Sequence, residues 1–295
     1  MNMQLISRRI ISHLGLVALL SFIIFIFASS NANANHPVFV EGNCLVSPAG
    51  TSSVITNGTC GDYDGDGLIG NDEDNDGDRV FGTITGAITN ATTGANQNGR
   101  VTIVTSGVFA EVVNITAANG NVQLEAAPGV EAIVDAVLQG DPGSGGRQGA
   151  PGIIVDAPDN RRVVIKNIVS RNWTNGIDVR GSSHVVIAKC RVENNANFGI
   201  LVSDNARVVI KDSHITDTGF RVGATGDFPT TSTPNPGIGI RFDGSSSGVV
   251  AHTLVSGSFA AGISGVRGLP KNVQIIDSVI FDNNPDFENV RKVKP

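Results

Sequence analysis

Residues 161–219 read RRVVIKNIVSRNWTNGIDVRGSSHVVIAKCRVENNANFGILVSDNARVVIKDSHITDTG, and the pattern recurs about every 23 residues. After an interruption it continues at 237–242 as GIGIRF, at 248–264 as GVVAHTLVSGSFAAGIS and at 272–284 as NVQIIDSVIFDNN. Each unit has short runs of Val and Ile, separated by Gly, Asn and Asp residues that favour turns. A repeat of this kind predicts a solenoid, in which each unit buries its apolar side against neighbouring units.

Aligned on this period, the units keep one class of residue in each column. The first apolar column contains Val164, Ile187, Ile210, Val250 and Ile275, and the second contains Val169, Val192, Ile215, Val255 and Ile280. A Gly-Ile pair recurs at Gly176, Gly199, Gly239 and Gly262. One column of small or polar residues contains Asn172, Asn195, Thr218, Ser258 and Asn283. Another contains Asn167, Cys190, Ser213, Thr253 and Ser278. Polar side chains stacked at a bend can satisfy backbone groups that the bend leaves unpaired.

The residue classes in these columns favour strands over helices. Val and Ile suit a strand with one inward face, and no unit contains the long stretch with a 3.6-residue apolar period that a helical repeat needs. A β-sandwich is the alternative, but its strands have no reason to keep one residue class at one place in five units. The sequence therefore predicts an all-β protein, a parallel β-helix. Phe81, Ile84 and Ile88 are spaced for a short amphipathic helix that caps its N-terminal end.

The segment before the repeats contains further strand-like runs. It reads GRVTIVTSGVFAEVVNI at 99–115 and NVQLEAAPGVEAIV at 121–134. Over about 80–295 the chain resembles secreted right-handed β-helix proteins of the pectin-lyase-like superfamily, whose first turns typically read this way. The resemblance implies a right-handed solenoid. It implies no single activity, because the superfamily contains lyases, hydrolases, esterases, epimerases, adhesins and non-catalytic proteins.

The catalytic residues of these enzymes are not assembled in this sequence. Calcium-dependent pectate lyases hold their metal with several carboxylates on one sheet, and the corresponding outward positions here are Ile154, Asp178, Leu201, Arg241 and Ser264. Asn175-Gly-Ile-Asp178 echoes polygalacturonase-type hydrolases but lacks their partner carboxylates and histidine motif. We therefore expect a non-catalytic protein that binds extracellular or cell-wall polysaccharide or acts at the cell surface. A lyase or esterase acting on uronate polymers is the alternative, and a purely structural or adhesive protein is a third.

Residues 1–34 have the pattern of a secretory signal peptide. Arg8 and Arg9 precede an apolar run from Leu14 to Phe27, and Ala32-Asn-Ala34 is a small-x-small cleavage site. An uncleaved membrane anchor is the alternative, but a bilayer span needs about 20 apolar residues and this run is shorter. We expect a secreted protein, extracellular or periplasmic, whose mature form has no membrane span.

The charge of the chain bears on its partners, and its cysteines bear on a disulfide. The chain has 21 basic and 27 acidic residues, and removal of the signal peptide with its two arginines makes the balance more acidic. An acidic protein has no electrostatic reason to bind nucleic acid. Cys44 and Cys60 lie in a stretch with little core, and we expect a disulfide between them in an exported protein.

Residues 62–73 read DYDGDGLIGNDE and fit the twelve-position calcium-binding loop. The expected ligands are Asp62, Asp64 and Asp66 at positions one, three and five, the backbone carbonyl of Leu68 at seven, and a bidentate Glu73 at twelve. A second register contains Asp72, Asp74, Asp76 and Asp78, but Arg79 and Thr83 occupy its eighth and twelfth positions, so it is incomplete. The loop resembles those of dockerin and thrombospondin type 3 repeats, which implies structural calcium. An acidic solvated linker is the alternative.

The chain thus divides into a signal peptide at 1–34, an irregular calcium-binding segment at 35–79 and the β-helix at 80–295. Insertions at 139–151 and 220–236 both precede a Gly-Ile strand, so they leave the solenoid at one corner and predict a groove between them. The expected ligand-binding residues are Trp173, Arg171, Asp178, Phe198, Arg147 and Arg221. An exposed Trp beside Arg is typical of a surface that binds sugars, and anionic ones in particular. The alternative is that Trp173 packs beneath a loop.

Overall fold

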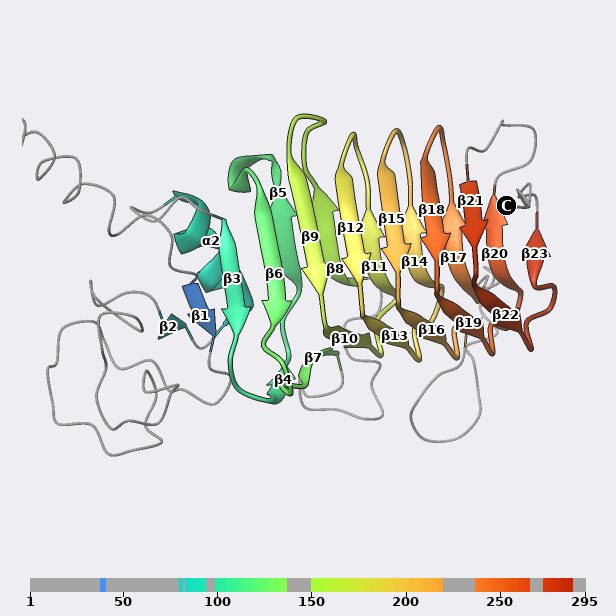
Figure 1. Ribbon diagram of the computed structural model, residues 1–295, viewed down its shortest axis with the longest axis horizontal. Helices are drawn as coiled ribbons and strands as arrows, with labels where there is room; N and C mark the ends of the chain where they lie inside the picture. Colours follow the sequence, from blue (N-terminus) through green and yellow to red (C-terminus); the bar gives the residue numbers. More distant parts are fainter. Residues whose placement is uncertain are drawn as a thin grey trace, which may run out of the picture. The chain divides into compact units, whose positions relative to one another are not determined.

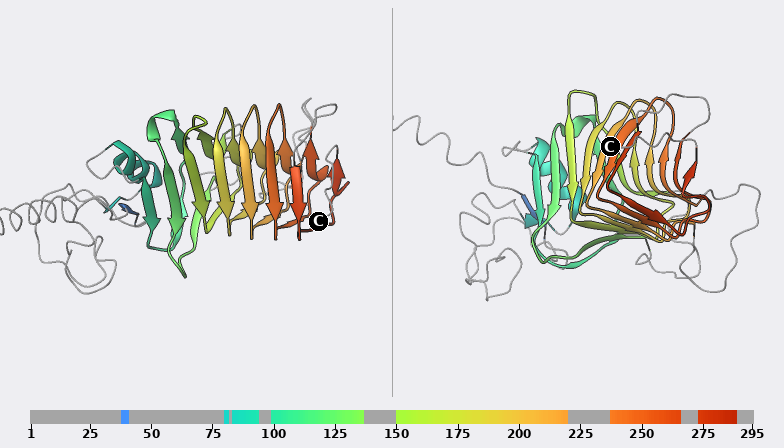
Figure 2. Two further views of the ribbon diagram at one scale, coloured as in Figure 1. Left: turned by 45° about the horizontal axis from the view of Figure 1, so that its top comes forward. Right: turned by 45° about the vertical axis from the view of Figure 1, so that its right-hand side comes forward.

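The computed structural model describes residues 38–40, 80–81, 83–93, 99–136, 150–219, 237–265 and 273–288. These residues form three parallel sheets around one apolar core, which is the parallel β-helix that the repeats predict (Figure 1). Each turn of the solenoid adds one strand to each sheet, and the strands of a sheet lie side by side in both views of Figure 2.

The three sheets are named A, B and C in the order in which a turn visits them. Sheet A contains β2 (Val80–Phe81), β1 (Val38–Val40), β3 (Arg100–Ile103), β6 (Val122–Ala126), β9 (Arg162–Lys166), β12 (His184–Ala188), β15 (Arg207–Lys211), β18 (Ser247–Ala251) and β21 (Val273–Ile276). Sheet B contains β4 (Gly107–Phe109), β7 (Ala132–Asp135), β10 (Ile168–Arg171), β13 (Arg191–Glu193), β16 (His214–Thr216), β19 (Leu254–Ser256) and β22 (Val279–Phe281). Sheet C contains β5 (Val113–Thr116), β8 (Pro151–Asp156), β11 (Asn175–Val179), β14 (Phe198–Val202), β17 (Ile238–Phe242), β20 (Ala261–Gly265) and β23 (Phe287–Glu288).

The core is made by alternate residues of each strand. In β9, Val163 and Ile165 are fully buried, whereas Val164 between them is partly exposed on the outer face of sheet A. The same alternation holds in β12 and β15, since successive side chains of a strand point to opposite faces. Val, Ile and Ala make up most of the buried interior.

Most of the predicted columns are confirmed by the strand pairing. Ile187 pairs with Ile210, Val192 pairs with Ile215, and Ile177 pairs with Ile200. The first unit is an exception in sheets A and B, where its strands start one residue later than the 23-residue spacing requires. Ile165 rather than Val164 pairs with Ile187, and Ser170 rather than Val169 pairs with Val192.

The same shift changes which residues of the first unit occupy the polar columns. Trp173, not Asn172, takes the place equivalent to Asn195, and its backbone N donates a 3.1 Å hydrogen bond to Asn195 Oδ1. Further along the solenoid, Ser258 N donates in the same way to Asn283 Oδ1. By the same register buried Ile168, not Asn167, is equivalent to Cys190. A polar ladder was therefore correctly predicted, but its first member was not.

Asn and Asp recur because the corners require a left-handed backbone. The corner after sheet A has a positive φ at Asn167, Lys189, Asp212, His252 and Asp277, and the corner after sheet B at Asn172, Asn194, Asp217, Gly257 and Asp282. Asn, Asp and Gly adopt this conformation at the lowest cost. The turn-forming residues between the apolar runs thus set the bends that fold each unit into three strands.

The predicted N-terminal cap is confirmed as helix α2 (Ile84–Thr93), whereas Phe81 belongs to β2. Ile84, Ala87, Ile88 and Ala91 are buried against the core of the first turns. The Glu111 carboxylate accepts hydrogen bonds from Ile84 N at 2.7 Å and Thr85 N at 3.0 Å, which satisfies free N–H groups at the start of the helix. Thr83 Oγ1 accepts a third from Gly86 N, and it therefore caps this helix.

Several predicted features lie outside the described residues. These are the signal segment 1–34, Cys44 and Cys60, the first acidic register at 62–73, the second register at 72–83 apart from Val80, Phe81 and Thr83, the insertion at 139–151 apart from its last two residues, and the insertion at 220–236. Strand β1 comes from the segment 35–79 and pairs with β3, which ties that part of the segment to sheet A. Within the described ranges, no helix is both long and apolar enough to cross a membrane.

Candidate functional site

Trp173 is buried in the solenoid, so the expectation of an exposed Trp was wrong. Its side chain is only 2 % exposed, and its Nε1 donates a 3.0 Å hydrogen bond to the backbone oxygen of Val134. The indole packs directly on Gly152, where an added Cβ would lie 2.5 Å from Trp173 Cδ1. The physical reason is the one-residue shift in the first unit, because moving a residue by one position exchanges the inward and outward faces.

Arg171 is engaged in a network of charges on the outer face of sheet B. Its Nε lies 2.6 Å from Asp135 Oδ2 and its Nη1 lies 3.8 Å from Glu193 Oε1. Glu193 also pairs with Arg191, which reaches Glu131 on the far side of the network at 2.9 Å. The charge of Arg171 is therefore balanced by two carboxylates, which weakens the case for Arg171 as a ligand for an anionic sugar.

Asp178 lies on sheet C at the position paired with Ile154 and Leu201, as expected, but it is only 7 % exposed. Burial raises the pKa of its carboxyl above the ordinary value of 3.8. Arg180, whose Nη2 lies 3.4 Å away, and a side-chain hydrogen bond with Asn175 act in the opposite direction, while Asp204 and Asp156 add to the rise.

Because burial disfavours the ionised form of Asp178, we expect Asp178→Asn to raise the melting temperature at pH 7. The folded-state pKa is raised, so the unfavourable contribution of the carboxylate is present above that raised value and vanishes as the pH falls below 3.8. The advantage of the variant should therefore shrink on acidification. Thermal unfolding at pH 7 and pH 3.5 measures it, with Asp277→Asn at an exposed corner as the control. A variant less stable than wild type at pH 7 would contradict this account.

The remaining residues of the predicted groove do not complete it. Phe198 is partly buried and begins β14, where it pairs with Asn175 and Ile238. Arg147 and Arg221 lie outside the described residues. The described members of the predicted set are thus divided among the core, sheet B and sheet C, and they form no shared exposed surface.

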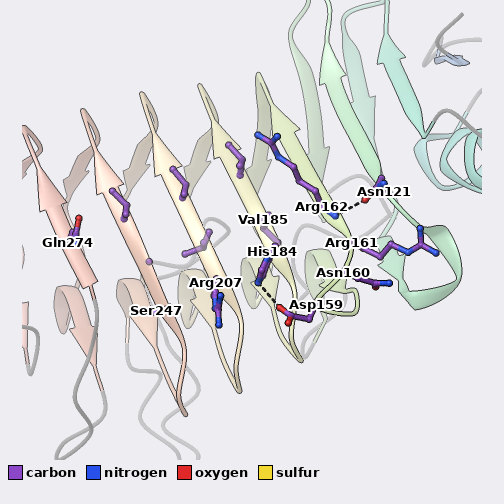
Figure 3. Close-up of a pocket in the computed structure, with 15 residues that line it drawn as sticks. Asn121, Asp159, Asn160, Arg161, Arg162, His184, Val185, Arg207, Ser247 and Gln274 are labelled. Carbon is purple, nitrogen blue, oxygen red and sulfur yellow. Dashed lines mark hydrogen bonds and ion pairs between the residues drawn. The ribbon is translucent and has the colours of Figure 1, made fainter. Parts of the chain in front are cut away.

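The structure has a different concave site, on the outer face of sheet A, with a volume of about 500 Å³ (Figure 3). We call it the sheet A site. Its floor is formed by β9, β12, β15 and β18, and Gln274 of β21 marks one end. Asn121 and the turn at 159–161, which leads from β8 to β9, border it at the other end. That connection is two residues longer than the equivalent one before β12.

The floor contains two rows of outward side chains. The register places Arg162, His184, Arg207 and Ser247 next to one another at the starts of four neighbouring strands. Two residues further along each strand, Val186, Val209 and Val249 form a parallel apolar row, and Val164 continues this row on β9 outside the lining of the site. Val209 is 37 % exposed, and Val186 and Val249 are partly exposed. The site thus combines an apolar strip with a row of nitrogen-bearing side chains.

Most arginines elsewhere in the described part of the chain are paired with carboxylates, whereas those of this site are not. Arg171, Arg180, Arg191 and Arg241 each pair with at least one carboxylate on sheets B and C. Arg161, Arg162 and Arg207 have no carboxylate of the described residues within 4.0 Å, although the chain carries a net charge of −6. Arginines without a carboxylate partner among the described residues are typical of surfaces that bind anions.

His184 is the one member of the row that has a charged partner. Its Nε2 lies 2.7 Å from Asp159 Oδ1, on the turn that borders the site (Figure 3). The two side chains are 37 % and 70 % exposed, so the pair is accessible to solvent. Asp159 is the sole carboxylate among the residues that line the site.

The sheet A site was not predicted, although the sequence carries a signal for it. The runs Val163-Val164-Ile165, Val185-Val186-Ile187 and Val208-Val209-Ile210 each contain three consecutive apolar residues. A strand with one buried face needs only the first and third, so the middle valine must lie outside. Arg162, His184 and Arg207 each stand two residues before the middle valine, so they lie on the same outer face.

The comparison with protein families agrees with this architecture. A model of the right-handed β-helix region matches residues 49–233, which is more than half of the chain. The chain belongs to the right-handed β-helix family. The right-handed sense expected from the resemblance is thereby confirmed, whereas the family does not decide among activities. No curated protein and no solved structure matches the chain.

Two further features of the described residues bear on the chemistry of the protein. Burial raises the pKa of the Cys190 thiol to about 11, and the side chain lies between strands with Sγ 3.4 Å from Ala188 O. A thiol in this state is a packed side chain and not a nucleophile. Among the described residues, no group of three or more His, Cys, Asp or Glu is placed to hold a metal ion.

Proposed function

We propose that this protein is exported, is stabilised near its N-terminus by calcium, and binds an acidic polysaccharide without cleaving it. The observation that carries the proposal is the set of unpaired arginines at the sheet A site, Arg161, Arg162 and Arg207, beside an apolar row. Guanidinium groups bind carboxylates and sulfates through two parallel hydrogen bonds. The C–H face of a sugar ring can rest on the valines.

A linear polymer suits the shape of the site better than a small anion does. The lining residues come from the turn before β9 and from strands β9 to β21, five neighbouring strands about 4.8 Å apart. A chain of sugars lying across these strands would meet equivalent side chains at each turn. The polysaccharide-related character of the family points in the same direction.

The binding test compares two arginine sites on one protein. We expect Arg162→Gln and Arg207→Gln each to weaken binding to polygalacturonate about ten-fold, since each removes a charge-assisted contact. Arg191→Gln is the matched control, because Arg191 is also exposed but is already paired with Glu131 and Glu193. Isothermal titration at two salt concentrations measures the effect, and added salt should weaken binding. Dextran, a neutral polymer, should not bind.

Two outcomes would overturn the proposal. Equal losses in the Arg191→Gln control would mean that the overall charge, and not the sheet A site, attracts the polymer. Absorbance from newly formed unsaturated uronates during the titration would mean that the protein is a lyase, which is the alternative that the resemblance leaves open.

The proposed calcium site makes a separate prediction. Asp62, Asp64, Asp66 and Glu73 supply the hard oxygen ligands that Ca²⁺ prefers, and the metal binds only the folded loop. Excess calcium should therefore raise the resistance of residues 35–80 to proteolysis. Glu73→Gln should weaken calcium binding at least about ten-fold, because it removes the bidentate ligand. Asp76→Asn in the incomplete register is the matched control. Equal proteolysis with calcium and with chelator would contradict the prediction.

A further inference from the structure

The contact between His184 and Asp159 has no evident role in holding the solenoid together. Both side chains lie outside the core, and the pair is exposed, so it contributes little to stability. The turn itself is held by other bonds: Arg161 N donates to Pro158 O at 2.9 Å, Ala157 N donates to Ser183 Oγ at 2.7 Å, and Arg162 N donates to Asn121 Oδ1 at 2.8 Å. The Asp159 side chain is thus not needed to hold the turn, and it can act at the sheet A site.

The position of His184 is what makes the contact informative. His184 pairs in register with Arg162 on one side and with Arg207 on the other, so the three side chains begin three consecutive strands. The two arginines have no carboxylate partner among the described residues, and the histidine between them has Asp159. The protein therefore places its own carboxylate at the middle position of a row whose other positions are open to anions.

The geometry of the contact indicates a partner that can be exchanged. The Asp159 side chain is 70 % exposed, and its Oδ1 lies 2.7 Å from Nε2 of His184, whose side chain is 37 % exposed. An ion pair between two exposed side chains is weak, so an acidic group of a ligand can replace Asp159 at little cost.

We propose that His184 is an anion subsite, which Asp159 occupies in the free protein and which one acidic group of the bound polysaccharide takes over. The inference rests on the proposed function and makes it more specific. The ligand presents acidic groups to three consecutive turns, at Arg162, His184 and Arg207, and it is therefore a polyuronate or similarly charged polymer with an acid on each sugar. Asp159 is an internal competitor that the ligand displaces.

A double-mutant cycle with polygalacturonate tests the displacement. Asp159→Asn should tighten binding up to about five-fold, which corresponds to the loss of one exposed competing ion pair. In a His184→Gln background the same change should have no effect, because the subsite for which Asp159 competes is gone. Glu125→Gln is the matched control: Glu125 also lies on sheet A, but it pairs with Lys166 at 2.9 Å.

The outcomes separate the subsite from the proposed function. Suppose that wild type binds polygalacturonate and that Asp159→Asn tightens binding equally with and without His184. The effect is then a general change in the electrostatic potential of the surface, and the subsite is refuted. A similar gain in Glu125→Gln, or no gain in Asp159→Asn, refutes it as well. Absence of binding by wild type and by every variant overturns the proposed function, and the subsite with it. Melting temperatures of the variants, expected to match wild type, verify that each is folded.

Discussion

Trp173→Ala is expected to lower the free energy of unfolding by about 3–5 kcal/mol, the usual cost of truncating a buried aromatic residue. The indole is the largest fully buried side chain of the described residues. It takes the place that Asn195, Thr218, Ser258 and Asn283 occupy in later turns. Its removal would leave a cavity beside Gly152, whose lack of a side chain prevents the neighbouring strand from filling the space. The Val134 carbonyl would also lose its hydrogen bond from Nε1.

Chemical denaturation of wild type and variant measures this loss. The matched control is Phe259→Ala, since Phe259 is an aromatic residue at a corner but is 61 % exposed, and it should change the stability by less than about 1 kcal/mol. Trp173 is the only Trp of the chain, so its fluorescence in wild type reports directly on the core. A Trp173→Ala protein as stable as wild type would show that the indole is not packed in the solenoid.

Gly199→Ala is expected to cost about 3 kcal/mol, because the solenoid has no room for one more carbon at this position. An added Cβ would lie 2.6 Å from the backbone oxygen of Gly239 and 2.6 Å from Ile215 Cγ2. The first of these atoms belongs to the backbone of the next turn, so the clash cannot be relieved by a change of rotamer. Equivalent contacts surround Gly176, Gly239 and Gly262, which explains why the Gly-Ile column recurs.

Gly107→Ala is the control for the general effect of replacing a strand glycine. Gly107 begins β4, and an added Cβ there would have no atom within 4 Å. This variant should be neutral or slightly more stable than wild type, since alanine restricts the unfolded chain. Thermal unfolding of both variants measures the difference. Equal stabilities of Gly199→Ala and Gly107→Ala would mean that adjacent turns are further apart at Gly199 than the structure places them.

Much of the fold could be predicted from the sequence because the solenoid repeats local rules. Columns of Val and Ile, corner residues such as Asp212 and Asn194, and the apolar spacing of α2 each reflect contacts within a turn or with the next one. The strand faces of the first unit were predicted incorrectly, because the spacing from this unit to the next is 22 residues in sheets A and B and 23 in sheet C. A constant period assigns Trp173 to the wrong face in such a unit.

The candidate site was less accessible from the sequence, for two reasons. The pairing of Arg171 with Asp135 joins residues 36 positions apart, and no local pattern shows which arginines are neutralised and which are not. The contact of Asp159 with His184 likewise depends on the longer turn before β9 lying over the neighbouring strand. The outward valines could be predicted from the sequence, because alternate residues of a strand point to opposite faces and the first and third apolar residues of each run already fill the inward positions.

The regular stacking of turns has a consequence for how this protein could change in evolution. Residues 184–206 form one complete turn, with β12, β13 and β14, and they begin and end at the same corner. Duplication of this segment would insert a strand into every sheet and a new side chain into the row of the sheet A site, while each existing residue keeps the same kind of neighbour. The length of the sheet A site is therefore a modular property, which can grow or shrink in steps of one strand spacing, about 4.8 Å, without redesign of the core.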